Sequence, residues 1–205
     1  MRNVFFNGIY RRLIILRRLI LSGDRFSRNF ILPNVKKVFQ KRVEYGNDIK
    51  CYQKLLITGA GKVIIGDKCS FGFKYGGFFK SACVELQART PEAVIEIGNN
   101  LATNNNVFIC SSGSVKIGND CLIGQFVTIM DFEAHGIAPD QRRNMGLIGT
   151  VEIKNNVWIG NNVTILKNTS IGNNSIVAVG AVASGHFPDN VIIGGVPARI
   201  IKTID

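Results

Sequence analysis

The amino-acid sequence predicts an all-β fold, a parallel β-helix built from hexapeptide repeats. The first observation behind this prediction is a period of six residues in the C-terminal half of the chain. The period matches neither an α-helix nor a simple alternating strand, but it equals three strand alternations, so inward positions stay in phase. Branched apolar residues mark the period at Ile153, Ile159, Ile165, Ile171 and Val177. Four positions after each of them stand Val157, Val163, Thr169, Ser175 and Ala181.

The second observation is a polar pair that recurs between the apolar positions. The pairs are Asn119-Asp120, Asn155-Asn156, Asn161-Asn162 and Asn173-Asn174. Asn and Asp tolerate left-handed backbone and therefore suit repeated tight turns. Three units of six residues then close a triangular coil, and successive coils stack by parallel β pairing at about 4.8 Å.

The repeat extends toward the N-terminus and is interrupted near the middle of the chain. Ile117, Ile123 and Ile129 keep the phase, whereas Ile65 and Ile97 begin isolated copies. Residues 130–152 break the period and predict a long loop that leaves the prism. Long excursions from a rigid scaffold tend to carry function. This loop contains His135, one of only two histidines.

The charge distribution divides the chain into a basic N-terminal arm, residues 1–54, and a β-helix domain, residues 55–205, with a C-terminal tail at 186–205. The formal net charge is +11. Residues 1–54 hold 13 Lys and Arg against 3 Asp and Glu, a net of +10, and residues 55–205 hold 12 against 11, a net of +1. The nearly neutral domain has no basic stripe, so we expect no nucleic-acid partner.

Five cysteines and two histidines limit the redox and metal chemistry of the protein. The cysteines form no CxxC pair and their number is odd, which favours a reducing cytosol over a disulfide framework. Cys69 and Cys121 fall at repeat positions that take small residues, and we interpret them as buried filler. Because no Cys/His cluster has metal-ligand spacing, we expect no metal.

Three segments of the C-terminal half carry a resemblance to a known family. They are Asn155-Asn156-Val157-Trp158-Ile159-Gly160, Pro188-Asp189-Asn190-Val191 and Gly194-Gly195-Val196-Pro197-Ala198-Arg199. The run from residue 101 to residue 205 resembles the hexapeptide-repeat acyltransferases, most of all the galactoside, maltose and capsular-polysaccharide O-acetyltransferase branch. The resemblance implies a left-handed β-helix and a homotrimer with active sites between subunits. It also implies acetyl transfer from acetyl-CoA to a hydroxyl of a sugar or of a capsule, exopolysaccharide or lipopolysaccharide precursor.

The resemblance further implies direct transfer, with His135 in the loop as the general base. An imidazole can take the proton of a hydroxyl group as that group attacks the thioester. Asp131, Glu133 or a backbone carbonyl could orient the ring, and the sequence does not choose between them. The main-chain N–H of Asn161 is the implied donor to the oxyanion of the tetrahedral intermediate.

By the same matching, two further groups of residues should bind the acceptor and the cofactor. The implied substrate-binding residues are Asn104, Asn106, Asp131, Arg142 and Trp158, and the implied cofactor-binding residues are Trp158, Asn161, Val179, Ser184 and Arg199. The alternatives are an ordinary turn at residues 104–106, a solvated charge at Arg142 and a packing role for Trp158. Many family members carry Thr-Lys where this chain has Ser184-Gly185, which leaves His186 or Arg199 to contact the phosphates.

The N-terminal arm predicts a basic amphipathic helix. Its apolar face holds Ile9, Leu13, Leu16 and Ile20, and Arg11, Arg18 and Arg25 lie nearly opposite. Such a helix either attaches to an anionic membrane surface or packs across the end of the trimer. The longest uncharged apolar stretch between the arginine pairs, residues 13–16, is too short for a bilayer span or a secretory core. We therefore expect a cytoplasmic protein, with peripheral attachment to the inner face of the membrane as an alternative.

Two other functions remain open at this point. The same fold and cofactor serve N-acetylation of an amino sugar nucleotide, in which an amine replaces the hydroxyl group. A β-helix can also act as a non-catalytic scaffold, although a histidine inside a long loop argues against that function.

Overall fold

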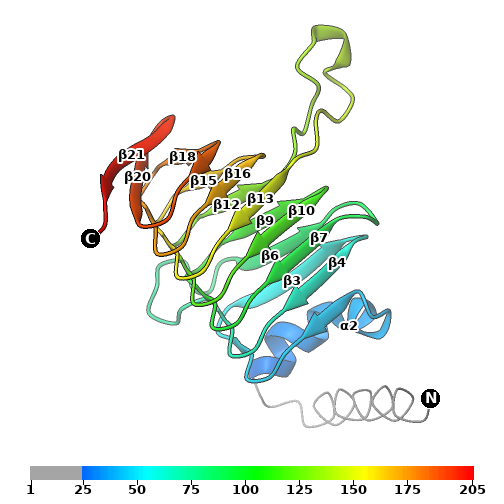
Figure 1. The fold of residues 1–205 in the computed structure, drawn as a ribbon. Coiled ribbons are helices and arrows are strands. Elements are labelled where there is room, and N and C mark those ends of the chain that lie inside the picture. The colour runs from blue at the N-terminus through cyan, green and yellow to red at the C-terminus, as the bar shows by residue number, and fades with distance from the viewer. Residues whose placement is uncertain (1–24) are drawn as a thin grey trace, which may run out of the picture.

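The computed structural model describes residues 25–205, which form a triangular prism of stacked coils with helices at its N-terminal end (Figure 1). The predicted amphipathic face of Ile9–Ile20 lies outside the described residues. Each coil contributes one strand to each of three faces, and all neighbouring strands pair in parallel except the last two. The six-residue period thus closes into coils, as the sequence predicts.

The strands of the three faces follow one another in a fixed order. The first face holds β1 (Val43–Tyr45), β4 (Lys62–Ile65), β7 (Val94–Ile97), β10 (Ser114–Ile117), β13 (Thr150–Ile153), β16 (Thr169–Ile171) and β19 (His186–Phe187). The second face holds β2 (Lys50–Cys51), β5 (Ser70–Phe71), β8 (Ala102–Thr103), β11 (Leu122–Ile123), β14 (Trp158–Ile159), β17 (Ile176–Val177), β20 (Val191–Gly195) and β21 (Ala198–Thr203). The third face holds β3 (Lys54–Gly59), β6 (Cys83–Ala88), β9 (Phe108–Ser111), β12 (Thr128–Met130), β15 (Thr164–Ile165) and β18 (Val182–Ala183).

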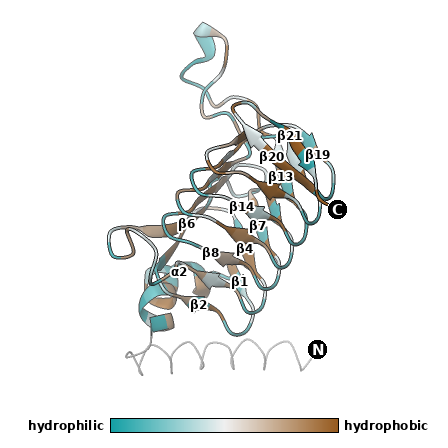
Figure 2. Cartoon of the chain, turned by 90° about the vertical axis from the view of Figure 1, so that its left-hand side faces the viewer, coloured by the Kyte–Doolittle hydropathy of each residue, from teal (hydrophilic) through white to brown (hydrophobic). Residues whose placement is uncertain are grey.

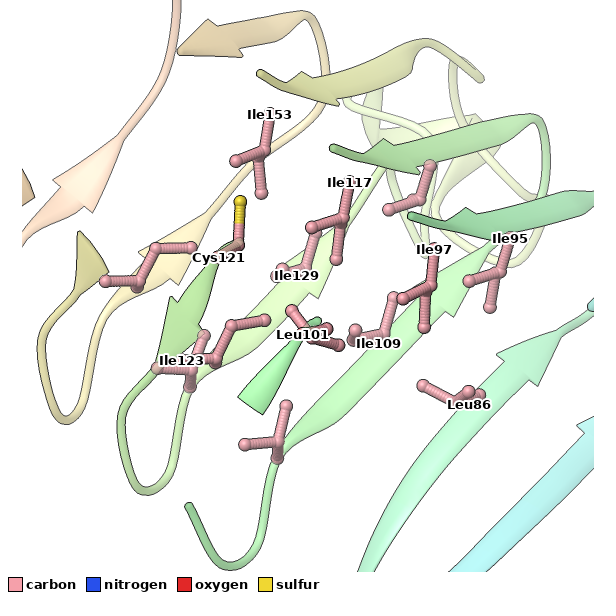
Figure 3. Close-up of a cluster of buried hydrophobic side chains, with 14 of the residues drawn as sticks. Leu86, Ile95, Ile97, Leu101, Ile109, Ile117, Cys121, Ile123, Ile129 and Ile153 are labelled. Carbon is pink, nitrogen blue, oxygen red and sulfur yellow. The ribbon is translucent and has the colours of Figure 1, made fainter. Parts of the chain in front are cut away.

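The predicted apolar stripe lines the prism. Ile153, Ile159, Ile165, Ile171 and Val177 are all at most 1% exposed, and Figure 3 shows side chains of this kind pointing inward from several coils. Cys69 and Cys121 are also fully buried, as expected, and the thiol of Cys121 approaches the backbone carbonyl of Lys154 at 3.2 Å. Burial raises the pKa of the Cys51 thiol to about 12. All five cysteines are free.

The corner between the first and second faces, called the first corner, is held by a ladder of side-chain oxygens. Each coil places an Asn or Asp there whose side chain accepts the backbone N–H of the equivalent residue one coil earlier, at 2.6–3.1 Å. The ladder runs through Asn47, Asp67, Asn99, Asn119, Asn155, Asn173 and Asp189. The residue that follows each of the last three ladder residues has a positive φ, as at Asn156 and Asn174. Asn adopts this backbone conformation at low cost. The turns between strands are largely hydrophilic (Figure 2).

Two short helices close the N-terminal end of the prism, η1 (Ser27–Ile31) and α2 (Leu32–Phe39). Phe30 and Ile31 are fully buried against the first coils. Asn34 extends the edge of the third face, because its Oδ1 accepts the Ile57 N–H at 2.7 Å and its Nδ2 donates to the Leu55 carbonyl at 2.7 Å. No helix within residues 25–205 is both long and apolar enough to cross a membrane.

The first coil begins earlier than the expected boundary at residue 55. Strands β1 and β2 precede that residue and pair with β4 and β5. The sequence missed them because the six-residue spacing is irregular in this region. At the other end, the expected tail, residues 186–205, is part of the prism. Strand β19 completes the first face, and β20 and β21 form an antiparallel pair at the end of the stack.

Candidate functional site

The long loop occupies residues 131–149, between β12 and β13, slightly shorter than the predicted 130–152. It leaves the corner between the third and first faces, called the third corner, and rises clear of the prism (Figure 1). Its two legs run side by side. Phe132 and Ile148 form an antiparallel bridge, and Glu133 exchanges backbone hydrogen bonds with Leu147 and Gly146.

Asp131 anchors the root of this loop. The residue is fully buried, and its carboxylate accepts hydrogen bonds from the Ser111 hydroxyl at 2.6 Å, the Ser112 N–H at 2.8 Å and the Gly113 N–H at 3.1 Å. Its carbonyl accepts the Gly149 N–H at 2.6 Å, which closes the base of the loop. With both carboxylate oxygens engaged inside the protein, Asp131 has no atom that faces an acceptor, contrary to the substrate-binding role predicted for it.

His135 is exposed on the loop and held by a backbone group. Its Nδ1 lies 2.8 Å from the carbonyl oxygen of Arg142. A carbonyl oxygen only accepts, so the proton of the neutral ring resides on Nδ1, and no atom of residues 25–205 is hydrogen-bonded to Nε2. The backbone carbonyl is therefore the orienting group among the three that the sequence left open.

The charged neighbours of His135 are engaged elsewhere. Glu133 forms an ion pair with Lys167 at 3.2 Å. The Leu147 N–H and then the Lys167 ammonium lower the pKa of the Glu133 carboxyl. The Arg142 guanidinium turns back on the loop and donates from Nε to the Ile137 carbonyl at 3.3 Å.

A shallow hollow of about 290 Å³ lies on the second face and at the corner that follows it, called the second corner. It brings together Asn104, Trp158 and Asn161, three of the residues predicted from the sequence. The Trp158 side chain stands on β14 with 54% of its surface exposed, which excludes a buried packing role. The lining is completed by Tyr52, Ser70, Gly72, Phe73, Ala102, Thr103, Leu122, Ile123 and Gly124.

At the second corner, Asn161 accepts a bond of the kind that holds the first corner. Its Oδ1 accepts the N–H of Gln125, the equivalent residue one coil earlier, at 2.7 Å. In the next coil the equivalent position is Val179, whose side chain has no acceptor. The Asn161 N–H consequently has no partner among residues 25–205 and is open to an incoming oxygen.

The neighbouring asparagines play different parts. The Asn104 Oδ1 accepts the Asn105 N–H at 2.7 Å, which makes a local turn at the edge of the hollow. Asn106 faces away from the hollow, because its N–H and its Oδ1 bind the two ends of the buried Gln53 amide at 2.9 and 3.1 Å. For Asn106 the structure thus supports the turn alternative.

The predicted cofactor residues are exposed and spread along the C-terminal half of the prism. Val179 stands at the second corner and Ser184 at the third. Arg199 on β21 donates to the carbonyl of Ala198 at 2.7 Å. His186 is occupied differently, since its Nδ1 lies 2.8 Å from the Ser170 hydroxyl. No group of three potential metal ligands gathers within the described part of the chain.

His135 and the hollow do not meet within one chain. The loop leaves the third corner, whereas the hollow borders the second, and His135 is not among the residues that line it. Sequence reasoning also missed Tyr52 and Phe73 in the hollow. A signal was present for Phe73, because Phe71 to Lys80 is an irregular stretch rich in Gly and Phe.

Comparison with known proteins finds relatives of the repeat region. Residues 150–185 match the family model described as bacterial transferase hexapeptide (six repeats). The galactoside O-acetyltransferase of Escherichia coli K12 is 36% identical over 112 residues, which cover 54% of this chain and 55% of that protein. WbbJ of the same strain, provisionally named as a lipopolysaccharide biosynthesis O-acetyl transferase, is 40% identical over 121 residues, 53% of this chain and 60% of that protein.

The fold is likewise that of a solved galactoside acetyltransferase in complex with coenzyme A, with a TM-score of 0.59 and 23% identity over 100% of this chain and 84% of that chain. Residues 150–185 thus carry the repeat described by that family model, and the prism has the fold of a left-handed parallel β-helix. It is matched over little more than half the length of these two curated relatives.

The anchoring of the loop by Asp131 can be tested by substitution. Asp131→Ala should lower the melting temperature and expose residues 131–149 to limited proteolysis, because each buried donor left without a partner costs about 1–3 kcal/mol. The matched control is Asp140→Ala, since Asp140 lies exposed at the far end of the same loop and accepts only from Gln141. Equal melting temperatures for the two variants would show that Asp131 does not anchor the loop.

Proposed function

We propose that this chain is an acetyl-CoA-dependent O-acetyltransferase that acts on a hydroxyl of a sugar or polysaccharide precursor. The observation that carries the proposal is a pair of unfilled positions, the Nε2 lone pair of His135 and the N–H of Asn161. A general base and an oxyanion donor are the two groups that acyl transfer to a hydroxyl requires. The names of the two curated relatives favour oxygen over nitrogen as the acceptor atom.

In the proposed reaction, Nε2 of His135 takes the proton of the acceptor hydroxyl while its oxygen attacks the thioester carbonyl of acetyl-CoA. The N–H of Asn161 stabilises the resulting oxyanion. Collapse of the intermediate breaks the carbon–sulfur bond, and the imidazolium returns its proton to the departing thiolate. The Arg142 carbonyl supports this cycle, because it keeps Nδ1 protonated and Nε2 directed away from the loop.

The two halves of the site belong, in this proposal, to neighbouring subunits of a homotrimer. The loop carries His135 away from its own prism together with apolar side chains that are well exposed, among them Ile137 at 72% and Leu147 at 67%. Exposed apolar groups of this size mark a contact surface. A second copy would cover them and at the same time bring its hollow to the base.

Acetyl-CoA would lie along the C-terminal coils, with Trp158 beside the acetyl group and Val179 and Ser184 along the arm of the cofactor. Arg199 is the proposed phosphate contact, since His186 is bound to Ser170 and no lysine follows Ser184. Asn104 is the proposed acceptor contact at the edge of the hollow. Neither Asn106 nor Asp131 presents a free group at the hollow. Arg142 contributes its main-chain carbonyl, which orients His135.

The proposal includes a cytoplasmic location with the basic arm at an anionic membrane surface, near lipid-linked precursors. The charge of the arm supports this part of the proposal, because residues 1–54 carry a net charge of +10. Phe30, Ile31 and Asn34 fix the described start of the arm to the prism. Packing of the arm across the end of the trimer is the competing arrangement.

Exchange of His135 separates the two functions of the site. His135→Ala should reduce the rate of acetyl transfer by about 10²- to 10⁴-fold, because it removes the general base, and should leave acetyl-CoA binding unchanged in calorimetry. The matched control, His186→Ala, exchanges the other histidine and should keep full turnover.

Arg199→Ala should show the converse and raise KM for acetyl-CoA. The assay includes amine and hydroxyl sugars, and near-full turnover by His135→Ala would refute the mechanism.

Complementation between variants tests whether the site is shared. Asn161→Pro removes the N–H, so this variant and His135→Ala should each be inactive alone. In mixed trimers, a site is intact when the Asn161→Pro subunit supplies His135 and the His135→Ala subunit supplies the Asn161 N–H. Random mixing should therefore restore about a quarter of the sites. Circular dichroism checks that Asn161→Pro is folded. A mixture as inactive as its parents would place the whole site within one chain.

Deletion of residues 1–24 tests the role of the arm. The shortened protein should lose binding to vesicles that contain phosphatidylserine, since each basic residue near an anionic surface contributes about 1 kcal/mol. Binding by the full chain should also weaken as salt rises. The prism should stay folded, because the contacts of Phe30 and Asn34 remain. Unchanged vesicle binding would leave packing on the trimer as the role of the arm.

A further inference from the structure

Residues 72–82 form a second excursion from the prism, at the second corner and beside the hollow. In the next two coils this corner takes only residues 104–107 and 124–127, between β8 and β9 and between β11 and β12. The longer segment carries three exposed aromatic residues, Phe73, Tyr75 and Phe78. Neither the regular coil nor the proposed transfer chemistry accounts for them.

Buried amide side chains of the prism hold this segment in place. Asn105 is fully buried, and its amide makes three bonds to the segment, accepting from the Phe73 N–H at 2.8 Å and donating to the carbonyls of Phe73 and Gly77 at 3.0 Å each. Gln53, 2% exposed, donates to the Phe78 carbonyl at 3.3 Å, and Gln125 donates to Gly77 at 2.8 Å. The exposed rings are therefore mounted on a fixed support.

The three aromatic residues divide into two groups. Phe73 lines the hollow, and Tyr75, which is 77% exposed, meets it edge to face with the ring centres 5.7 Å apart. Phe78 instead packs on Phe126, with the ring centres 5.2 Å apart. The first pair thus continues the wall of the hollow outward, whereas Phe78 serves the support. Exposed aromatic surface on a fixed support is typical of a binding site.

The lining of the hollow indicates what binds there. Phe73 and Trp158 supply aromatic surface, and Ser70 and Asn104 supply hydroxyl and amide groups. No carboxylate from the described residues takes part in the lining. Few polar groups set among aromatic surfaces match a sugar ring, which has an apolar C–H face and a rim of hydroxyl groups.

We infer that residues 72–82 are a glycan-binding platform, on which Phe73 stacks against the sugar that receives the acetyl group and Tyr75 against the adjoining sugar of the same chain. The acceptor is then an oligosaccharide or polysaccharide rather than a free monosaccharide. This inference rests on the proposed function and narrows its substrate class. Tyr75 acts as a specificity determinant and takes no part in the chemical step.

The single tryptophan, Trp158, lies in the hollow and reports binding directly through its fluorescence. The probes are mono-, di- and tetrasaccharides of glucose, galactose and N-acetylglucosamine, followed by an array of bacterial surface glycans. We expect an oligosaccharide to bind at least about tenfold more tightly than its monosaccharide, a difference of about 1.4 kcal/mol. Tyr75→Ala should abolish that difference, and Tyr75→Phe, which keeps the aromatic ring, should retain it.

Transfer assays on the same saccharides separate this inference from the proposed function. For oligosaccharide acceptors, Tyr75→Ala should raise KM about tenfold with kcat and the KM for acetyl-CoA unchanged. Transfer without any preference for the chain length of the acceptor, or with equal KM for Tyr75→Ala and the wild type, would overturn the platform and leave the proposed function standing. Oligosaccharide binding without transfer to any acceptor would overturn the proposed function and leave the platform standing. If no glycan bound, either in the fluorescence titration or on the array, the platform would be overturned.

Discussion

The hydrogen bond from one coil to the side-chain oxygen of the next, repeated along the first corner, is the interaction on which the remaining structure depends. It fixes the rotation of each coil relative to its neighbours, and a slip of one residue would turn every inward Ile outward. The ladder is continuous from Asn47 to Asp189, across coils that differ widely in the lengths of their other corners. With the first corner fixed, the other two corners can vary without loss of the core. They can lose a bond, as at Asn161, or extend into a loop, as at residues 131–149 and 72–82.

The groups available for chemistry lie at those departures from the repeat. Within residues 25–205 the Asn161 N–H has no acceptor, because Val179 stands where an Asn or Asp would accept it. His135 stands on an extension whose root is closed by a buried carboxylate, and Phe73 stands on an extension held by a buried amide. In both extensions a buried polar side chain, with its capacity for hydrogen bonds satisfied, fixes the segment that carries the exposed ring. Such support is what a site needs for its groups to be in position before the substrate arrives.

Much of the fold could be predicted, because the apolar phase and the turn residues are local signals. The inward positions of Ile153 and Ile159, the turn at Asn156 and the interruption before β13 all follow from spacing. The partners of Asp131 could not be predicted in this way, since Ser111 and Ser112 lie about twenty residues earlier and meet it only when the coils stack. The orienting carbonyl of Arg142 depends on the bend of the loop, and the support of Phe73 by Asn105 spans 32 residues. The strands before residue 55 escaped prediction because their coil lacks the regular period.

The architecture also explains why the proposed site requires two chains. A stacked coil is rigid, and its corners are held apart by the strands between them, so the second and third corners of one prism do not approach each other. A loop that leaves the third corner and projects outward carries His135 away from the hollow of its own chain. The missing partner must then come from a surface that presents a second corner, and a copy of the same chain is the simplest source, because rotational symmetry completes every site by the same contact. Ile137 and Leu147, which are exposed in the single chain, would be covered by the second copy in that proposed arrangement.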